Sequence, residues 1–557
     1  LAAGGAASAA FERWDEVSGA VITGDTVVAL VAATNQVKAT STDGRTGVAF
    51  TYFSADAETV RLTPGRRRFR RTGFDTALTV RTSIGSMVGG RVLGDAAGHM
   101  LVVPGTTGFP PPVVWCCDAN RDEVVLESDG SPTAPVVIAA GFDEGRVRLV
   151  RLEPGGGISL ISSSPQNLPD PDALDVTRTS APFGGSPSGG LVALADGVVA
   201  SLRSDGQHRL IVLAHEELDA GHPVATVSSR HLGSDVYLSS NPRYDAETFA
   251  VLDEARTEPA EIREVSLTDG TERLSWSETA PGYQPETYVV SRHTFPSADG
   301  TAVPATLYRH RDTPLDGSAP CLIYGYGAYE VVFEPEWEPA LPSLLDRGVV
   351  YVYAHIRGGG EGGRHWYLDG KLANKQHTFD DQIAVADGLA QAGLVDPSRI
   401  ATRGLSAGGL LQGAVFSQRP DRWTAVVAEV PFVDVITSMS DPSTPLTITE
   451  WEEWGDPRIP EQHAWMSAYD PYRNLPRAGS RPPLLITGAL HDPRVMVREP
   501  AKWAAALRAS DPEWGDQCLF RVETGAGAHA GPSGRLAHLA YEAEIYAWVL
   551  DKLGVRQ

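Results

Sequence analysis

Residues 400–418 read IATRGLSAGGLLQGAVFSQ, and this stretch decides the fold of the second half of the chain. A short apolar run is followed by Gly404-Leu405-Ser406-Ala407-Gly408 and then by a segment with the composition of a helix. A G-x-S-x-G sequence between a strand and a helix holds its serine on a sharp, exposed turn, and the turn leaves no room for a Cβ at the flanking glycines. This context predicts that Ser406 is a nucleophile, against the simpler interpretation that it caps a helix.

The sequence on both sides of this motif alternates apolar strands with long amphipathic segments, which is typical of a mostly parallel sheet covered by helices. We therefore predict a doubly wound α/β hydrolase domain over residues 286–557. Its predicted strands are 321–324, 349–355, 400–403, 425–429, 484–487 and 518–523. Its predicted helices are 380–392, 407–418, 500–508 and 536–553.

The first half of the chain has a different pattern, in which short β-branched runs are separated by turns that contain Asp-Gly or Pro-Gly. AETVRLTPG (57–65) and EIREVSLTDGTERL (261–274) are two examples of this pattern. Such runs predict strands joined in hairpins. We therefore expect an all-β domain over residues 1–285, as a β-propeller of roughly seven blades or as a pair of sandwiches.

A nucleophilic serine needs a base, and the base needs an acid that orients it. In the α/β hydrolase fold these follow in the order Ser, Asp, His. Asp492 comes just after the predicted strand 484–487, and His529 lies in the loop GAGAHAGPSG before the last predicted helix. The alternatives are an aspartate that caps a turn and a solvated loop histidine, but the order and the positions favour a triad.

Attack on a carbonyl creates an oxyanion that needs donors already in place. The backbone N–H of Ala407, directly after the nucleophile, is one expected donor. The second is expected from Tyr326 in the stretch YGYG (324–327), which follows an early strand. A tight turn with packed aromatic rings is the competing interpretation of that stretch.

The composition disfavours several classes of function. The chain has 557 residues, with 47 Lys and Arg against 70 Asp and Glu, so its formal net charge is −23. This charge disfavours nucleic acid and anionic membranes and favours cationic partners such as short basic peptides. We expect no metal or cofactor, because no metal-binding motif occurs and GAGAHAG lacks the glycine spacing of a dinucleotide loop.

The cysteines and the hydropathy pattern bear on location. The cysteines are Cys116, Cys117, Cys321 and Cys518, too few for a disulfide framework and without the spacing of a zinc site. No long apolar segment or signal peptide is evident. These features favour a cytoplasmic protein without a membrane span, and they leave its oligomeric state open.

Longer motifs in the second half resemble the prolyl oligopeptidase family of serine peptidases, and within it oligopeptidase B. They include YGYGAY (324–329), AHIRGGGEGGRHWYLDGKL (354–372), GLSAGGLL (404–411), EVPFVDV (429–435), PLTITEWEEWGDP (445–457) and EPAKW (499–503). The resemblance covers most of residues 281–557. It implies that Ser406, Asp492 and His529 form the triad and that Tyr326 and Ala407 form the oxyanion hole.

The same resemblance implies the residues that bind substrate. Arg494 matches an arginine that holds a substrate backbone carbonyl, and Glu450 with Glu452 matches the carboxylate pair that binds Arg or Lys before the scissile bond. Two acids in an enclosed pocket favour a guanidinium or an ammonium over a proline ring. Glu334 and Glu336 fall where oligopeptidase B has aspartates that favour a basic residue at P2. The competing interpretation of each pair is solvated acids in a very acidic protein.

The resemblance further implies a seven-bladed propeller that covers the active site and admits only short peptides. In the first half the match is weak until about residue 200 and becomes recognisable around SSNPRYDAETF (239–249). The family's usual N-terminal segment, with its D-P-Y-x-W-L-like motif, is not found. Two interpretations follow, a chain without its natural beginning or a branch that lacks this segment.

The sequence thus predicts a serine endopeptidase that cleaves short peptides after Arg or Lys. The alternatives are a prolyl-specific oligopeptidase, an esterase or acylaminoacyl peptidase with the same triad, and a non-catalytic scaffold whose propeller binds partners.

Overall fold

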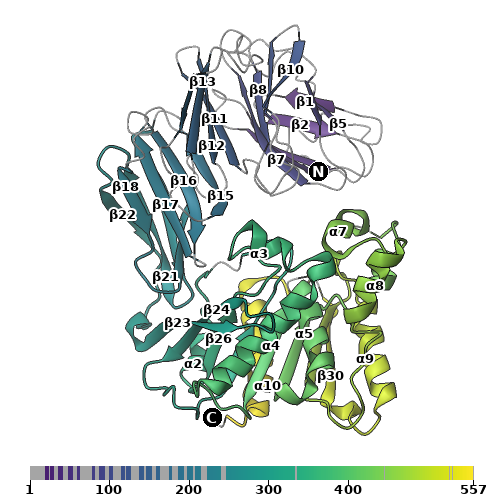
Figure 1. The fold of residues 1–557 in the computed structure, drawn as a ribbon. Coiled ribbons are helices and arrows are strands. Elements are labelled where there is room, and N and C mark those ends of the chain that lie inside the picture. Colours follow the sequence, from purple (N-terminus) through teal and green to yellow (C-terminus); the bar gives the residue numbers. More distant parts are fainter. Residues whose placement is uncertain are drawn as a thin grey trace.

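We analysed a computed structural model of the chain, which describes residues 223–239, 246–332, 335–444, 446–525, 527, 529 and 531–555, and earlier in the chain only the β-strands. Two units of secondary structure follow one another along the sequence (Figure 1). The first consists of antiparallel sheets, and the second is one large sheet covered by helices.

The second unit is built on an eight-stranded sheet with the order β23-β24-β26-β25-β27-β28-β29-β30. β23 and β24 form an antiparallel hairpin, β24 pairs antiparallel with β26, and the remaining neighbours are parallel. The strands are β23 (Tyr288–Pro296), β24 (Ala302–His310), β25 (Cys321–Tyr324), β26 (Val350–Ala354), β27 (Ile400–Leu405), β28 (Ala425–Glu429), β29 (Leu484–Ala489) and β30 (Cys518–Glu523).

Both faces of this sheet are buried, which explains why its central strands are almost continuously apolar. Successive residues of a strand point to opposite faces. In β25, Cys321 and Ile323 face one core, and Leu322 and Tyr324 face the other.

Helices cover both faces of the sheet (Figure 1). α4, α5 and α9 contribute to the core that contains Cys321, whereas α2 and α10 contribute to the opposite core. α6, α7 and α8 follow β28 and carry further apolar side chains into the first core. The helices are α2 (Pro342–Leu345), α3 (Arg364–Leu368), α4 (Gln376–Gln391), α5 (Ala407–Gln418), α6 (Val435–Met439), α7 (Thr447–Trp454), α8 (Pro460–Tyr469), α9 (Arg498–Ser510) and α10 (Arg535–Lys552), with short 3₁₀ turns η5 (Pro285–Thr287), η6 (Leu372–Asn374), η7 (Pro420–Arg422) and η8 (Gly515–Gln517).

The predicted α/β hydrolase architecture of the second half is confirmed, with boundaries shifted by a few residues. Every predicted strand and helix of this half is present. The β23–β24 hairpin and the helices α6 to α8 have no counterpart among the predicted elements. These helices have between 5 and 10 residues each, which is too short for a helical period to stand out in the sequence.

The strands of the first half are arranged in antiparallel sheets, as its hairpin pattern predicts. Three sheets have four strands each, in the orders β11-β12-β13-β14, β15-β16-β17-β18 and β19-β20-β21-β22. Before them come a six-stranded sheet of the order β10-β9-β8-β7-β4-β3 and the pairs β1-β2 and β5-β6. Four-stranded meanders are the unit of a propeller blade, but the propeller itself stays a prediction.

The bounds of these strands complete the description of the first half. They are β1 (Gly19–Thr23), β2 (Thr26–Leu30), β3 (Gln36–Ser41), β4 (Val48–Phe53), β5 (Thr59–Leu62), β6 (Leu78–Arg81), β7 (Met87–Gly94), β8 (Met100–Pro104), β9 (Val114–Asp118), β10 (Arg121–Leu126), β11 (Val137–Asp143), β12 (Arg146–Leu152), β13 (Ile158–Ser163), β14 (Asp175–Arg178), β15 (Ser186–Ala193), β16 (Gly197–Ser204), β17 (Gln207–Ala214), β18 (Ala225–Ser228), β19 (Ser234–Leu238), β20 (Thr248–Ala255), β21 (Glu258–Ser266) and β22 (Glu272–Ser277).

The chain changes from one sheet to the next between β22 and β23, the interval that contains the predicted domain boundary at 285/286. None of the helices in the described part of the chain is long and apolar enough to cross a membrane.

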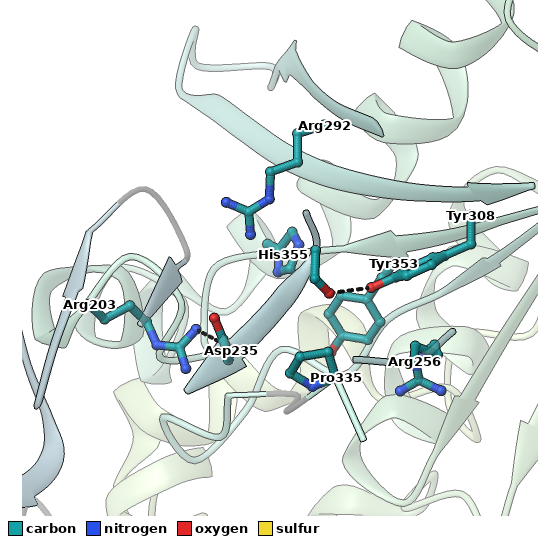
Figure 2. Close-up of a pocket in the computed structure, with 9 residues that line it drawn as sticks. Arg203, Asp235, Arg256, Arg292, Tyr308, Pro335, Tyr353 and His355 are labelled. Carbon is teal, nitrogen blue, oxygen red and sulfur yellow. Dashed lines mark hydrogen bonds and ion pairs between the residues drawn. The ribbon is translucent and has the colours of Figure 1, made fainter. Parts of the chain in front are cut away.

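A small cavity lies where the last sheets of the first half meet the edge of the hydrolase sheet (Figure 2). Arg203 forms an ion pair with Asp235 at 3.1 Å, and the Tyr308 hydroxyl donates to the carbonyl of Gly233 at 3.2 Å. The cavity has a volume of about 20 Å³, which gives room for about one water molecule. The cavity is lined by residues of both units and is too small to hold a peptide.

Candidate active site

Ser406 lies between the end of β27 and the start of α5, in a backbone conformation that is rare for a non-glycine residue. Its φ is 61° and its ψ is −113°. Its N–H donates to the carbonyl of Glu429 at 2.8 Å, and its carbonyl accepts from Leu410 at 3.0 Å. The turn is therefore fixed by the adjacent strand and by the first turn of the helix, as expected for a strained nucleophile elbow.

The two glycines of the motif sit where neighbouring backbone leaves no space. A Cβ on Gly404 would collide with the carbonyl oxygen of Gly408. A Cβ on Gly408 would lie 2.7 Å from the carbonyl oxygen of Gly325. The close approach predicted from the sequence is therefore present, and it brings the elbow against the loop after β25.

Four of the predicted site residues follow parallel strands of the sheet at their carboxyl ends, where ligands bind in open α/β sheets. Ser406 follows β27, Tyr326 follows β25, Asp492 follows β29 and His529 follows β30. Residues far apart in the sequence thus follow the carboxyl ends of the parallel strands, on one side of the sheet.

Asp492 and His529 are joined by a hydrogen bond in which the carboxylate accepts from the ring. Asp492 Oδ2 is 2.7 Å from His529 Nδ1. The other oxygen, Oδ1, accepts from the backbone N–H groups of Arg494 at 2.8 Å and Val495 at 3.1 Å. The Asp492 side chain has no exposed surface, whereas that of His529 is 14% exposed. The carboxylate is therefore held rigidly by backbone while it orients the imidazole.

Tyr326 and Ala407 line the same cavity as Ser406. The Tyr326 hydroxyl is hydrogen-bonded to the Ser406 side chain. Burial raises the pKa of Tyr326, so the phenol keeps its proton at neutral pH and stays a donor. Ala407 is the first residue of α5, where backbone N–H groups have no partner within the helix.

The cavity has a volume of about 490 Å³, which suits a side chain and part of a peptide backbone. Much of its wall is apolar, and two carboxylates, those of Glu450 and Glu499, also line it. The apolar wall includes Phe432, Met439, Leu446, Val495 and Met496.

Glu450 is on α7 and is held by two side-chain donors. Its Oε2 accepts from the Tyr329 hydroxyl at 3.0 Å and from Trp454 Nε1 at 3.2 Å. Burial raises the pKa of this carboxyl. The two donors fix the orientation of this half-buried carboxyl, and a cation that enters the cavity would favour its charged form.

The other predicted binding residues lie in different places. Arg494 lines the cavity, and its charge opposes part of the rise that burial causes in the pKa of Tyr326. Glu452 is exposed on α7 and does not line the cavity, because residues two apart on a helix point in different directions. Glu336 is exposed beside Glu254, whose pKa is raised by burial and by the charge of Glu336. Glu334 lies outside the described residues.

Glu499 also lines the cavity, although in the sequence it stands out only as the first residue of the motif EPAKW, which gives it no role. It accepts hydrogen bonds from the backbone N–H groups of Val433 and Asp434, each at 3.1 Å, and from Ser438 Oγ at 2.6 Å. Burial raises its pKa to about 7. Its place at the start of α9, in the stretch EPAKW, gives no local signal that it reaches a cavity beside the segment after β28.

A group of potential metal ligands, Asp299, Asp369 and His377, has its ligand atoms within 4.8 Å of one another. Arg357 Nη1 already binds Asp299 at 2.6 Å and Asp369 at 2.8 Å. The charges of these two carboxylates are therefore balanced by a buried guanidinium, which favours an ion-pair network over a metal site.

Comparisons with known proteins show what the second half of the chain is similar to. Residues 336–556 match the model of the prolyl oligopeptidase family. Dipeptidyl aminopeptidase BI from Pseudoxanthomonas mexicana is 42% identical over 319 residues, which are 57% of this chain and 44% of that protein. Protease 2 from Moraxella lacunata is 46% identical over 256 residues, which are 46% of this chain and 37% of that protein. The chain thus spans less than half the length of these two relatives.

Solved structures with the same fold cover nearly the whole chain. Oligopeptidase B from Trypanosoma brucei, in a closed form with covalently bound antipain, has a TM-score of 0.64 at 24% identity, over 98% of this chain and 88% of that chain. A structure from a study of two prolyl endopeptidases has a TM-score of 0.73 at 23% identity, over 96% of this chain and 79% of that chain.

The fold and the elbow that carries Ser406 define a hydrolase domain of the serine-peptidase class. Residues 336–556 are similar to the prolyl oligopeptidase family of serine peptidases, and the chain shares its fold with oligopeptidase B.

Proposed function

We propose that the protein is a serine endopeptidase that hydrolyses short peptides after Arg or Lys. The observation that carries this proposal is the meeting of Ser406, Tyr326, Ala407 and Glu450 in one cavity, with Asp492 and His529 paired at the same edge of the sheet. Ser406, His529 and Asp492, with the donors Tyr326 and Ala407, can perform acyl transfer, and Glu450 can select a cation.

In the proposed reaction, Ser406 Oγ attacks the scissile carbonyl and its proton passes to Nε2 of His529. Asp492, which accepts from Nδ1, stabilises the imidazolium and leaves Nε2 available to the serine. The Ala407 N–H and the Tyr326 hydroxyl donate to the oxyanion. The leaving amine takes the proton from His529, and water then hydrolyses the acyl-enzyme with His529 again as base.

The Ser406 hydroxyl must exchange partners during this sequence. In the described part of the chain it is hydrogen-bonded to Tyr326, while His529 is hydrogen-bonded to Asp492. Release of Tyr326 from the serine frees the phenol for the oxyanion and the hydroxyl for the base. One rearrangement therefore prepares both groups.

Specificity in this proposal depends on the cavity wall. The apolar side chains can cover the aliphatic stem of Arg or Lys, and Glu450 can meet the charged end. A proline ring would leave the Glu450 carboxylate partly desolvated without a counter-charge. Arg494, in the same wall, can donate to a substrate carbonyl. Glu334 and Glu336 remain predicted contacts of a P2 residue, and Glu452, which does not line the cavity, is expected to contribute little.

The test is turnover of matched fluorogenic peptides that place Arg, Lys, Pro or Phe before the reporter group, with the Ser406→Ala variant as control. We expect cleavage after Arg and Lys by the unaltered protein and none by the variant. Cleavage mainly after proline would overturn the pocket assignment, and no cleavage of any substrate would favour the scaffold alternative.

The similarity to a dipeptidyl aminopeptidase supports a second candidate, in which the enzyme removes dipeptides from a free N-terminus. Two forms of one Arg-containing substrate separate the candidates. An endopeptidase cleaves the N-acylated and the free form alike, whereas a dipeptidyl aminopeptidase cleaves only the free form.

The strand-rich first half belongs to the same proposal as a gating domain over residues 1–285. A gate predicts that kcat/KM falls steeply once a substrate with the same cleavage site is made too long to enter, and peptides of increasing length test this. A cytoplasmic location remains a prediction that rests on the small number of cysteines. Two of these, Cys321 and Cys518, are buried and form no disulfide.

A further inference from the structure

Lys375 is a buried lysine beside the loop that carries Tyr326. Its side chain is 2% exposed, between η6 and α4. The ammonium donates to the carbonyl oxygens of Gly327 at 2.6 Å and Gly370 at 3.2 Å. It also lies 4.9 Å from the centre of the Trp454 ring. A buried ammonium with these partners fixes the loop directly after Tyr326.

Glu453 holds the same loop with the opposite charge. Its Oε1 accepts from the backbone N–H of Tyr329 at 3.2 Å and lies 4.0 Å from Lys375 Nζ. Its Oε2 accepts from the Tyr367 hydroxyl at 2.8 Å. Lys375 and Glu453 thus form a clamp that binds the carbonyl of Gly327 and the N–H of Tyr329.

The clamped loop has a backbone that needs support. Tyr329 and Glu330 have φ values of 60° and 57°, a region that non-glycine residues seldom adopt. Gly327, which accepts from Lys375, has a φ of 67°. Strained segments persist only where surrounding contacts hold them.

The loop carries a group for each of two tasks. The Tyr326 hydroxyl is hydrogen-bonded to the Ser406 side chain and is the side-chain donor of the proposed oxyanion hole. Tyr329 donates from its hydroxyl to Glu450, and Trp454 Nε1 donates to that hydroxyl at 3.0 Å. A change in the position of the loop therefore moves the oxyanion donor and the support of the specificity carboxylate together.

We propose that Lys375, through its pairing with Glu453, is a positioning residue that holds Tyr326 for the oxyanion and couples the oxyanion hole to the cation-binding wall at Glu450. This inference rests on the proposed function and adds to it. It predicts that occupation of the pocket by a cation raises kcat as well as affinity, because Glu450, Tyr329 and the clamp form one connected set of contacts.

The charges that face Lys375 give the proposal a pH signature. Burial lowers the pKa of Lys375 to about 8, the charge of Glu453 on α7 opposes this shift, and Lys371 on the preceding segment adds to it. Tyr326 and Tyr329 have pKa values raised by burial and stay protonated in this range. The clamp is therefore charged below about pH 8 and loses its cation above it, so kcat should decline on the alkaline side.

The test compares Lys375→Met with Lys371→Met in the full chain. Lys371 is a matched control because it is also buried and donates to the Tyr367 hydroxyl at 2.8 Å. We expect Lys375→Met to lower kcat for arginyl substrates by about 10- to 100-fold, somewhat less than the loss of an oxyanion donor itself. We expect Lys371→Met to lower kcat less than Lys375→Met does, because Lys371 is linked to Glu453 through the Tyr367 hydroxyl.

Two inhibitors separate positioning from general damage to the pocket. Benzamidine needs only the cation-binding wall, whereas a peptidyl arginine aldehyde also forms an oxyanion on Ser406. In Lys375→Met we expect aldehyde binding to weaken in proportion to the loss of kcat. We expect benzamidine binding to weaken less, because Glu450 keeps its donor Trp454 when the loop shifts. Equal losses for both inhibitors, or an unchanged kcat, would overturn the proposal.

Two milder variants keep the test valid if Lys375→Met does not fold. Glu453→Gln keeps an acceptor for Tyr329 but removes the counter-charge, and it should lower kcat and shift the alkaline decline to lower pH. Tyr329→Phe removes a donor to Glu450 and should lower kcat/KM for Arg substrates more than for an uncharged ester. An unaltered protein that cleaves nothing would contradict the proposed function, whereas an active protein with unchanged variants would contradict the clamp alone.

Discussion

The two sides of the active-site cavity are held in different ways. On the side of the nucleophile, hydrogen bonds with backbone groups hold the reacting residues in place. The N–H of Ser406 donates to the carbonyl of Glu429, and the carboxylate of Asp492 accepts from the N–H groups of Arg494 and Val495. On the side that would recognise a cation, side chains hold the key group in place. The carboxylate of Glu450 accepts hydrogen bonds from the Tyr329 hydroxyl and the Trp454 indole.

This difference separates the chemistry from its specificity. Backbone bonds at a strand end are formed by the sheet itself and depend little on the identity of distant residues. A carboxylate held by side chains can be moved or replaced without disturbing the sheet. The reaction is thus tied to the fold, and the preferred substrate to a small set of side chains.

The largest expected effect on kcat comes from a substitution on the side of the cavity where backbone groups hold the reacting residues. Asp492→Asn keeps the shape but replaces the acceptor for His529 Nδ1 with an amide that can favour the wrong tautomer. We expect kcat to fall by about 10³- to 10⁴-fold. Steady-state kinetics with an arginyl substrate measures this, and Asp441→Asn, at a loop aspartate that accepts from the Ser443 N–H at 3.0 Å, is the control. A loss no larger than that of the control would mean that Asp492 does not orient the base.

An intermediate effect is expected on the side-chain-held side, where Glu450 and Glu452 make a matched pair on one helix. Glu450→Gln should lower kcat/KM for Arg substrates by about 100-fold, because a desolvated cation loses its counter-charge. Glu452→Gln should change kcat/KM by less than about threefold, as expected for an exposed charge. Equal losses in both variants would show that the two glutamates act as the pair implied by the resemblance.

The smallest effect on turnover is expected from the substitution Glu499→Gln. Glu499 lines the same cavity as Glu450, and its carboxylate accepts hydrogen bonds from two backbone N–H groups. Because burial raises its pKa to about 7, the folded state keeps a proton that the unfolded chain releases near the ordinary value of 4.5. The stability from this group is present below about pH 4.5 and is lost as pH rises through about 7. The loss should be at most about 3 kcal/mol.

Denaturant unfolding of the unaltered protein and of Glu499→Gln across this pH range measures that contribution. Asp434, which pairs with Lys502, faces the same carboxylate and is unchanged in both proteins. As the pH rises, the unaltered protein should lose stability relative to the variant. Parallel profiles would mean that Glu499 does not titrate in this range.

Much of the catalytic fold could be predicted from the sequence because its signals are local. The central parallel strands are buried on both faces and are therefore largely apolar runs. Gly404 and Gly408 mark a close approach that admits no side chain. The order of Ser406, Asp492 and His529 along the chain places all three at the carboxyl ends of strands. These inferences need no knowledge of distant contacts.

The parts that the sequence does not reveal depend on tertiary contacts. The resemblance pairs Glu450 with Glu452, but only the packing of α7 decides which of them enters the cavity. Lys375 and Glu453 give no signal, because each is an ordinary charged residue until the fold brings their charged groups to 4.0 Å beside the loop after β25. The role of Glu499 depends in the same way on the packing of α9 against the segment that follows β28.

One cavity is proposed to hold both a reactive serine and a wall that selects cations. Labelling of the full chain with a fluorophosphonate, followed by peptide mapping and repeated with benzamidine present, tests both parts at once. We predict a single adduct on Ser406 that forms more slowly as benzamidine fills the pocket. An adduct on another residue, no adduct, or a labelling rate that benzamidine does not change would contradict this proposal.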